Sequence, residues 1–502
     1  MKRSYYLLLF YAVLVFGFSY LISTICGELN CFPQQSPLII DVEGYGDDHL
    51  QGAVNILDYR LHLQPFNLVA LIIFVLAILH TFFAHQFTLW SQNRREKNIQ
   101  EKKRIVDTFD VEVLRFLGEV EVVFGIWVIP LMAAITYFYN WQSAVHYIET
   151  RSYIEPIFVV VIMTLASTKP IITLAEDCCQ FVAKLSGGTI RSWWWVLLIL
   201  GPLSGSLITE PGAMTISAVL LAKQFYDHKP STKLGYATLG LLFTNISVGG
   251  VFTNFAAPPV LMVSQVWEWD TPYMFFHFGW KSLLGMLLST SLYFFVFRKE
   301  FNEMEQKRQL HHRENELRDK NDLSTPLWIN VMHVLFMAWT VVNAHHPIIF
   351  IGSFLLFIGF YQATRPYQSH LSLRTPILVG FFLAGLVIHG SLQGWWIEPL
   401  LSSVSEGTLL FLSMFLTSFN DNAEITFLAT LIPQFSDTMK YSVLAGAVTG
   451  GGLTVIANAP NPSGQAILGK YFHGGISATG LLIGALIPAL ITTFSFYLFR
   501  AI

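Results

Sequence analysis

Long apolar runs dominate the chain and predict helices that cross a membrane. Eleven runs are about 18 residues or longer, which is enough to span the hydrocarbon core of a bilayer as a helix. They lie near residues 5–25, 66–89, 116–141, 156–186, 234–268, 277–298, 327–344, 347–364, 376–395, 440–472 and 474–499. Two further apolar stretches, 192–227 and 402–436, are too long for one helix and are polar at the centre. We expect these two to be re-entrant hairpins in an all-α polytopic membrane protein.

The basic residues orient these spans. The loop after the second span and the loop near residues 298–320 are rich in lysine and arginine, whereas Arg60 is the only such residue between 26 and 65. Basic loops stay on the cytoplasmic side, so we expect a cytoplasmic N-terminus and an external C-terminus. Short loops and short termini suggest a bacterial inner membrane.

The span count divides the chain into four parts. We expect an N-terminal helix and external loop at 1–65, a first repeat at 66–298, a cytoplasmic linker at 299–325 and a second repeat at 326–502. Each repeat holds five spans, an odd number, which predicts inverted topology. The first apolar run is long for a signal peptide and lacks a small-residue cleavage site, so we expect it to be retained. Cys26 and Cys31 fall outside, where a disulfide can form.

The two halves carry matching motifs. The hairpins turn at residues 209–215 and 420–426, and each places an acid, Glu210 or Asp421, five positions before a threonine. The span after each hairpin contains a glycine pair, then an Asn-x-x-x-Pro sequence beginning at Asn254 or Asn458. The expected helix-breaking residues are Gly249, Gly250, Pro258, Pro259, Gly451, Gly452, Pro460 and Pro462.

Broken helices in the middle of a membrane span predict a binding site. Glycine and proline free backbone carbonyls and amides, which is tolerated at that depth only where they line protein or a water-filled cavity. Thr253, Asn254, Asn458 and Asn461 could then bind a cation or an anion. A kink used only for packing is the alternative, but two kinks at matching places favour a site.

Ionisable residues inside the membrane are costly, so each is a candidate for the site. Glu210, Asp421 and Glu424 lie at the expected hairpin tips, where capping a helix is the alternative role. Lys169, Glu176 and Asp177 share one face of the fourth span. Lys169 could be an internal counter-charge, whereas the two acids approach the membrane surface.

Several motifs that would suggest other functions are missing from the sequence. It contains no phosphate-binding loop, no HExxH and no GxSxG motif, which argues against an ATP-driven pump and an intramembrane protease. We expect a transporter rather than an enzyme, with no cofactor and no nucleic-acid partner. Its partners would be the lipid bilayer and small inorganic ions.

Residues 66–499 resemble the ion transporter superfamily. Asn245-Ile246-Ser247-Val248-Gly249-Gly250, with Thr253 and Pro258-Pro259, is similar to its signature, and the branch of arsenite permeases and NhaD-type sodium–proton antiporters is the closest. Residues 420–426 and 450–462 resemble that branch's second-half motifs, and the chain as a whole resembles bacterial proteins described as Na⁺/H⁺ antiporters. The resemblance implies an ion site lined by Asn245, Thr253, Asn254, Asp421, Asn422, Thr426, Asn458 and Asn461.

The sequence departs from the family pattern at three places, and these places bear on which species is transported. Glu210-Pro211 replaces an Asp-Asn pair, Thr244 replaces a serine, and Val260 stands where the first-half asparagine is expected. Two acids at the site favour a cation, so we expect Na⁺/H⁺ exchange, with Na⁺ at Asp421 and Asn458 as a hypothesis. A permease for arsenite or a dicarboxylate, and a scaffold without transport, are the alternatives. Related folds are often dimers, which leaves a homodimer open.

Overall fold

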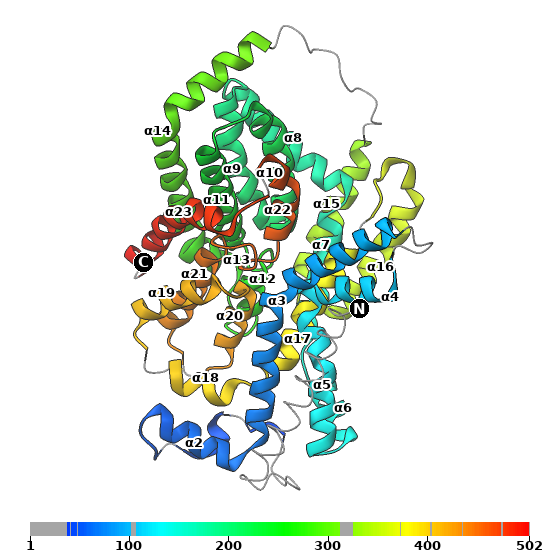
Figure 1. Ribbon diagram of the computed structural model, residues 1–502, viewed down its shortest axis with the longest axis vertical. Helices are drawn as coiled ribbons and strands as arrows, with labels where there is room; N and C mark the ends of the chain where they lie inside the picture. The colour runs from blue at the N-terminus through cyan, green and yellow to red at the C-terminus, as the bar shows by residue number, and fades with distance from the viewer. Residues whose placement is uncertain are drawn as a thin grey trace. The chain divides into compact units, whose positions relative to one another are not determined.

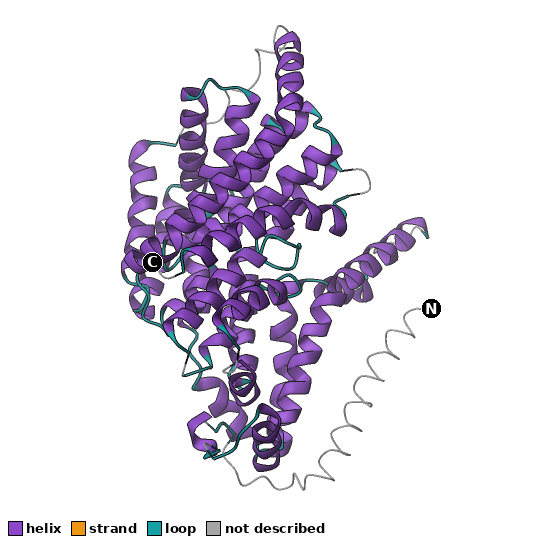
Figure 2. Ribbon diagram, turned by 90° about the vertical axis from the view of Figure 1, so that its left-hand side faces the viewer, coloured by secondary structure: helices purple, strands orange, loops and turns teal. Residues whose placement is uncertain are grey.

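The computed structural model describes residues 38–40, 42–47, 49–101, 107–311, 325–371, 373–401, 404–433, 435–472 and 475–500. Regular structure in these ranges is helical throughout, with no strand (Figure 2). The first expected span, Cys26, Cys31 and residues 312–324 of the expected linker lie outside the described residues. The expected domain boundaries stay a prediction.

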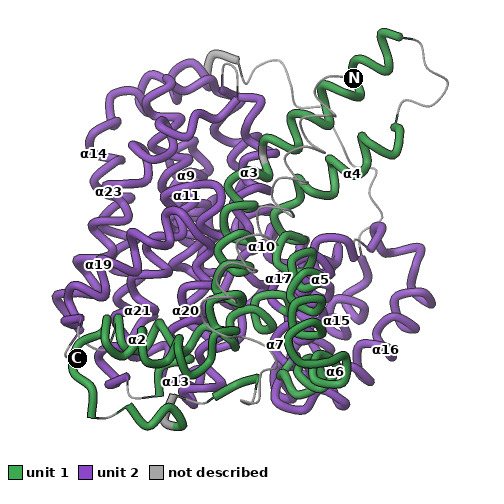
Figure 3. The backbone as a smooth tube through the Cα atoms, turned by 60° about the horizontal axis from the view of Figure 1, so that its bottom comes forward, with its two compact units in different colours: residues 1–152, 384–403, 431–433 green, residues 153–383, 404–430, 434–502 purple. Residues whose placement is uncertain are grey.

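The chain forms two compact units (Figure 3). Unit 1 combines residues 1–152, 384–403 and 431–433, and unit 2 combines residues 153–383, 404–430 and 434–502. The helices of unit 1 are η1 (Val42–Tyr45), α2 (Ala53–Leu63), α3 (Phe66–Gln100), α4 (Phe109–Leu117), η2 (Val120–Val122), α5 (Val123–Phe138), α6 (Trp141–Glu149) and α18 (Gly394–Leu401).

Unit 2 holds most of the helices. Its first part contains α7 (Ile154–Ala166), α8 (Lys169–Leu185), α9 (Ile190–Ile208), α10 (Glu210–Gln224), η3 (Tyr226–His228), α11 (Thr232–Gly249), η4 (Gly250–Phe252), α12 (Pro258–Ser264), α13 (Thr271–Met274), η5 (Phe275–Gly279) and α14 (Trp280–His311). Its second part contains α15 (Leu327–Val342), α16 (Pro347–Ala363), η6 (Arg365–Tyr367), α19 (Glu406–Thr417), α20 (Asn422–Thr430), α21 (Asp437–Gly450), α22 (Asn461–Leu468), η7 (Gly469–Tyr471) and α23 (Ala478–Leu498). One helix, α17 (Arg374–Gly390), runs from unit 2 into unit 1.

Several of these helices suit a membrane. Within the described residues, five are long and apolar enough to cross one: Phe66–Ala84, Val120–Phe138, Thr232–Phe252, Thr271–Arg308 and Ala478–Leu498. Two bent pairs, α7 with α8 and α17 with α18, raise the number to seven if each pair is one span. α15, α16 and α19 are shorter apolar helices. The chain therefore has the helices of a multi-pass membrane protein, while eleven spans and inverted repeats stay predictions.

Two pairs of helices are separated by breaks: the first break, 250–257, lies between α11 and α12, and the second break, 451–460, lies between α21 and α22. Local sequence explains where these helices stop and restart. α11 begins after Ser231, whose hydroxyl accepts a hydrogen bond from the Leu234 amide at 3.2 Å, and it ends at Gly249. α12 begins with Pro258 and Pro259, residues that have no amide hydrogen to leave unpaired in a first helical turn. In the second half, α21 begins after the cap Ser436 and ends at Gly450.

The short helices that follow these breaks contact the opposite half of unit 2. α12 packs against α20, and α22 packs against α10 (Figure 1). α9 and α10 form an antiparallel pair that turns at Thr209, while α19 packs mainly against α21. The two breaks and the two turns are thereby brought together inside unit 2.

Candidate functional site

Glu210 occupies the centre of this arrangement. It is the first residue of α10 and is fully buried. Its Oε2 accepts a hydrogen bond from Asn458 Nδ2 at 3.0 Å, and its Oε1 has no hydrogen-bond partner among the described residues. A Cβ atom on Gly250 would lie 2.7 Å from that Oε1, so glycine is needed for the carboxylate to approach the backbone here.

Backbone strain accompanies this acid. Thr209, the residue before Glu210, has a φ of 67° and a ψ of 153°. Residues other than glycine rarely adopt such positive φ values, which cost of order 1–3 kcal/mol and often occur at functional sites. The strained turn places Glu210 at the N-terminus of α10.

The second break is tied together by the side chain of Asn461. Its Nδ2 donates hydrogen bonds to the carbonyl oxygens of Gly451 at 2.7 Å and Thr454 at 2.8 Å. The carbonyl oxygen of Ala457 accepts a hydrogen bond from the backbone amide of Asn422 at 3.1 Å. The break therefore holds the first turn of α20 and presents Asn458 to Glu210.

Ser247 connects the two halves and was missed by our sequence reasoning. Its hydroxyl donates to the carbonyl oxygen of Val448 at 2.7 Å and accepts from Asn422 Nδ2 at 3.3 Å. A Cβ atom on Gly451 would clash with the Ser247 hydroxyl, and one on Gly452 would lie 2.5 Å from the Thr244 amide nitrogen. These glycines are needed because α11 approaches the second break so closely.

The first break is bound to the C-terminal part of α9. The hydroxyl of Thr253 donates to the carbonyl oxygen of Ser206 at 2.8 Å. A Cβ atom on Gly249 would lie 2.5 Å from the carbonyl oxygen of Pro202. The Ser206 hydroxyl in turn donates to the carbonyl oxygen of Gly249 at 2.6 Å, a contact with no clear signal in the sequence.

The second break repeats these contacts in the same register. The hydroxyl of Thr454 donates to the carbonyl oxygen of Ser418 at 2.9 Å. A Cβ atom on Gly450 would lie 2.5 Å from the carbonyl oxygen of Met414. Thr454 thus corresponds to Thr253, and Gly450 to Gly249.

The matching contacts pair the residues of the two breaks differently from the Asn-x-x-x-Pro motifs, which had matched Asn254 with Asn458. Counting on from the matched threonines places Ala257 opposite Asn458 and Val260 opposite Asn461. Asn254 instead donates to the carbonyl oxygen of Trp269 at 3.2 Å and accepts from the Thr271 hydroxyl at 2.8 Å. Its amide is engaged with the segment before α13, so Asn254 and Asn458 have different surroundings despite their similar sequences.

Two further predicted site residues make contacts within or between helices. Asn245 donates through Nδ2 to the carbonyl oxygen of Leu198 at 2.7 Å, which ties α11 to α9. The Thr426 hydroxyl donates to the carbonyl oxygens of Asn422 and Ala423, each at 3.1 Å, inside its own helix. Both side chains are buried.

The two acids of the second hairpin differ in environment. Asp421 is half-buried, and its Oδ1 accepts a hydrogen bond from the Ala423 amide at 2.8 Å, so it caps α20. Glu424 is fully buried, and the side chain of Asn420 lies close enough to interact with its carboxylate. Capping and ion binding are compatible, and the placement of Na⁺ at Asp421 and Asn458 stays a prediction.

The expected counter-charge group lies along α8. Lys169 is the first residue of α8, directly after a bend of 65° between α7 and α8. Glu176 is half-buried, and Lys223 of α10 lies close enough to attract it, while Asp177 is exposed. The counter-charge role of these residues stays a prediction.

A buried lysine in α14 was also missed by our sequence reasoning. Lys281 is fully buried, and its Nζ donates to the Tyr441 hydroxyl at 3.2 Å and lies 4.5 Å from the centre of the Tyr441 ring. The available signal was a lysine inside an apolar run, which marks a functional candidate in a membrane protein.

Buried oxygens without partners characterise the site as a whole. Asn245, Asn422, Asn458 and Asn461 each donate through Nδ2, and each Oδ1 lacks a partner in the described part of the chain. Oε1 of Glu210 also lacks a partner in these ranges, and so do the hydroxyls of Ser217, Thr244 and Thr417. No group of three His, Cys, Asp or Glu side chains is placed to hold a metal within the described ranges, but amide and carbonyl oxygens suit hard cations.

Apolar spans, two broken helices and buried acids define a polytopic helical membrane protein with an internal polar site. Residues 65–499 match a family described as "Putative Na+/H+ antiporter", and the chain belongs to that family. No curated protein matches the chain significantly. The family match identifies a multi-pass membrane transporter and supports exchange of a cation for protons.

Proposed function

We propose that this protein exchanges Na⁺ for H⁺ by alternating access to a buried site between the two broken helices. The pair formed by Glu210 and Asn458 is the observation that carries the proposal. A dehydrated cation needs oxygen ligands, and the buried Oε1 of Glu210 and Oδ1 of Asn458 both lack a hydrogen-bond partner among the described residues.

The orientation of the asparagine amides supports a cation. The Nδ2 atom of Asn461 contacts two carbonyl oxygens, and the Nδ2 atom of Asn458 contacts a carboxylate, so each amide nitrogen is the donor and each Oδ1 stays available. An anion would need the opposite arrangement, with free donors. This arrangement of the asparagines favours a cation over a dicarboxylate as the substrate.

Exchange requires Na⁺ and H⁺ to compete for the same group, and the Glu210 carboxylate can be that group. A fully buried carboxylate is costly unless it binds a cation or takes up a proton. If Glu210 binds Na⁺ when ionised and H⁺ when the site lacks Na⁺, then only one of the two ions occupies it at a time. Asp421 lies close enough to Glu210 to interact with it electrostatically, and it interacts with Glu424 as well, so Asp421 would adjust the charge of the site.

A transport assay with purified protein tests the proposal. The protein would be reconstituted in sealed liposomes with a trapped pH dye, a proton gradient imposed, and Na⁺, Li⁺, K⁺ or a dicarboxylate added in turn. Dissipation by Na⁺ or Li⁺ alone, lost in Glu210→Gln, supports exchange. Movement of the dicarboxylate alone would contradict it.

Membrane placement extends the proposal. The basic loops support a cytoplasmic N-terminus, the short loops support a bacterial inner membrane, and the odd number of expected spans in each half supports inverted repeats. Cysteine labelling from each side of sealed membranes would test the orientation, and the molecular mass of the purified protein in detergent would test for a homodimer.

A further inference from the structure

The end of α3 and all of α4 form a two-helix arm beyond the apolar span Phe66–Ala84 of unit 1. The apolar span in α3 ends at Ala84, but the helix continues to Gln100 and changes direction on the way (Figure 1). α4 returns beside it. We call residues 88–101 and 107–117 the arm.

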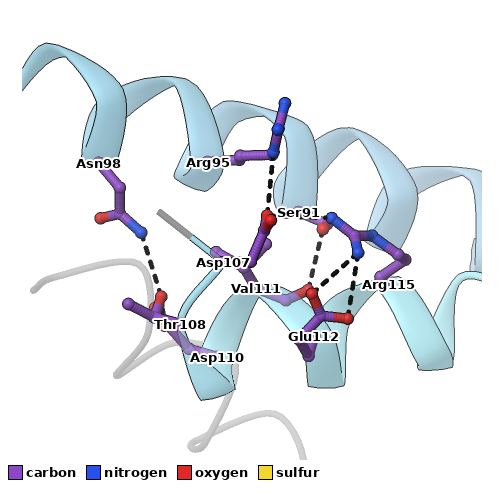
Figure 4. Close-up of polar contacts among 9 residues, drawn as sticks. All are labelled: Ser91, Arg95, Asn98, Asp107, Thr108, Asp110, Val111, Glu112 and Arg115. Atoms are coloured by element: carbon purple, nitrogen blue, oxygen red, sulfur yellow. Dashed lines mark hydrogen bonds and ion pairs between the residues drawn. The ribbon is translucent and has the colours of Figure 1, made fainter. Parts of the chain in front are cut away.

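Polar contacts hold the two helices of the arm together (Figure 4). The Ser91 hydroxyl donates to the carbonyl oxygen of Val111 at 2.9 Å, and Asn98 donates to the Thr108 hydroxyl at 3.1 Å. Each arginine of the arm is paired with an acid. These pairs are Arg94 with Asp110 at 2.6 Å, Arg95 with Asp107 at 2.9 Å and Arg115 with Glu112 at 2.8 Å.

The face of α4 that points away from α3 is apolar. Phe109 is 85% exposed and Phe116 is 52% exposed, with half-buried Val113 between them. Positions 109, 113 and 116 follow the spacing of one helix face, whereas Val111, on the other face, is buried. Large exposed aromatic side chains on one face mark a surface that contacts something apolar.

The opposite face of the arm is polar. Its α3 side exposes Gln92, Asn93, Glu96, Lys97 and Gln100. The exposed apolar residues on the α3 part of the arm are Leu89 and Trp90, which lie close to the membrane-spanning part of the helix, and Ile99 near its end. The arm is therefore amphipathic as a two-helix unit.

We propose that the arm lies on the bilayer surface, with Phe109, Val113 and Phe116 inserted among lipid headgroups and upper acyl chains. The apolar face of the arm is continuous with the lipid-facing surface of the α3 span, because the arm starts where that span leaves the membrane. Amphipathic helices bury such faces at the membrane surface, and Trp90 suits the same depth. Because each arginine in the arm's described residues is paired with an acid, we expect the apolar contact to contribute more to the association than these arginines do.

Lipid quenching of site-specific labels tests this inference. The four native cysteines are replaced, and single cysteines are introduced as Phe109→Cys and Phe116→Cys in the full chain, with Asn93→Cys and Gln100→Cys as controls on the polar face. Each variant carries a polarity-sensitive fluorophore in vesicles of zwitterionic lipid, with and without brominated acyl chains. We expect brominated lipid to remove most of the signal at 109 and 116, with blue-shifted emission, and to leave 93 and 100 nearly unchanged.

Three outcomes would overturn the inference. Equal quenching at all four positions would mean that the arm has no membrane-facing side. Quenching that requires anionic lipid would mean that charge drives the contact. Oxidative cross-linking of Phe109→Cys between copies, without quenching, would identify a second copy of the chain as the partner.

Discussion

The side-chain amide of Asn458 donates a hydrogen bond to Oε2 of Glu210 at 3.0 Å, although the two residues lie in opposite halves of unit 2. The amide orients the carboxylate while leaving Glu210 Oε1 and Asn458 Oδ1 without hydrogen-bond partners among the described residues. An ion bound by these oxygens would contact both halves, so binding would depend on how the halves are packed.

Removing the charge of Glu210 should abolish exchange. Glu210→Gln keeps the shape of the side chain but loses a charged ligand, which we expect to weaken Na⁺ binding by about 3 kcal/mol, roughly a hundredfold. Na⁺-driven proton flux in liposomes measures the effect. Glu303→Gln, on the exposed side of α14, is the matched control and should transport normally. Normal Na⁺-driven flux in Glu210→Gln would make Glu210 a structural residue.

A substitution at Asp421 separates helix capping from ion binding. Asparagine caps helices about as well as aspartate, so Asp421→Asn should keep expression and thermal stability. If the charge takes part in transport, exchange should fall about tenfold or more, which is about 1.4 kcal/mol. Wild-type flux in this variant would leave Asp421 with only the capping role.

The two breaks should respond alike to loss of their threonine hydroxyls. Thr253→Val and Thr454→Val each remove a hydrogen bond to a hairpin carbonyl, so each should lower the free energy of unfolding by about 1 kcal/mol. Thermal unfolding in detergent measures both. Thr215→Val, whose exposed hydroxyl donates within α10, is the control and should have little effect. Very different losses at 253 and 454 would contradict the matched register.

Adding a methyl group at Gly452 should damage the contact between α11 and the second break. The new Cβ would meet the backbone of Thr244, which cannot rotate away as a side chain can. We expect Gly452→Ala to cost about 1–3 kcal/mol of stability, measured by thermal unfolding. Gly359→Ala is the control, because nothing lies within 4 Å of its added Cβ, and it should be neutral or slightly stabilising. Equal stability of the two variants would rule out the close approach.

The arm should loosen in acid. Partial burial would raise the pKa of the Asp110 carboxyl, but the hydrogen bonds from Thr108 and Arg94 and the Arg94 charge outweigh it and lower the pKa below its ordinary value. The ionised carboxylate therefore stabilises the arm fully above the ordinary aspartate pKa of about 4, and this stabilisation is lost as the pH falls through the lowered value.

Spin-label mobility at position 113 measures this change. We expect it to be constant near neutral pH and to rise below about pH 4. Asp110→Asn should be more mobile at neutral pH and lose most of the pH dependence. A variant that retains the wild-type pH profile would show that another group controls the arm.

Much of the helical framework follows from local chemistry. Apolar runs predict membrane helices because unpaired backbone groups cannot remain in hydrocarbon. α11 ends at the expected Gly249, and α21 ends at Gly450, one residue before the expected Gly451. Within the described residues, the expected runs at 327–344 and 347–364 are helices, but they are too short to count as spans by length and composition alone.

The sequence by itself determined that this is a helical membrane protein and which residues are chemically capable of binding an ion. Tertiary structure alone decided the partners: Asn458 contacts Glu210, Asn254 contacts the segment before α13, and Ser247 contacts Asn422. Similar Asn-x-x-x-Pro motifs occupy different surroundings because contacts between distant segments depend on how the helices pack, which no local pattern encodes.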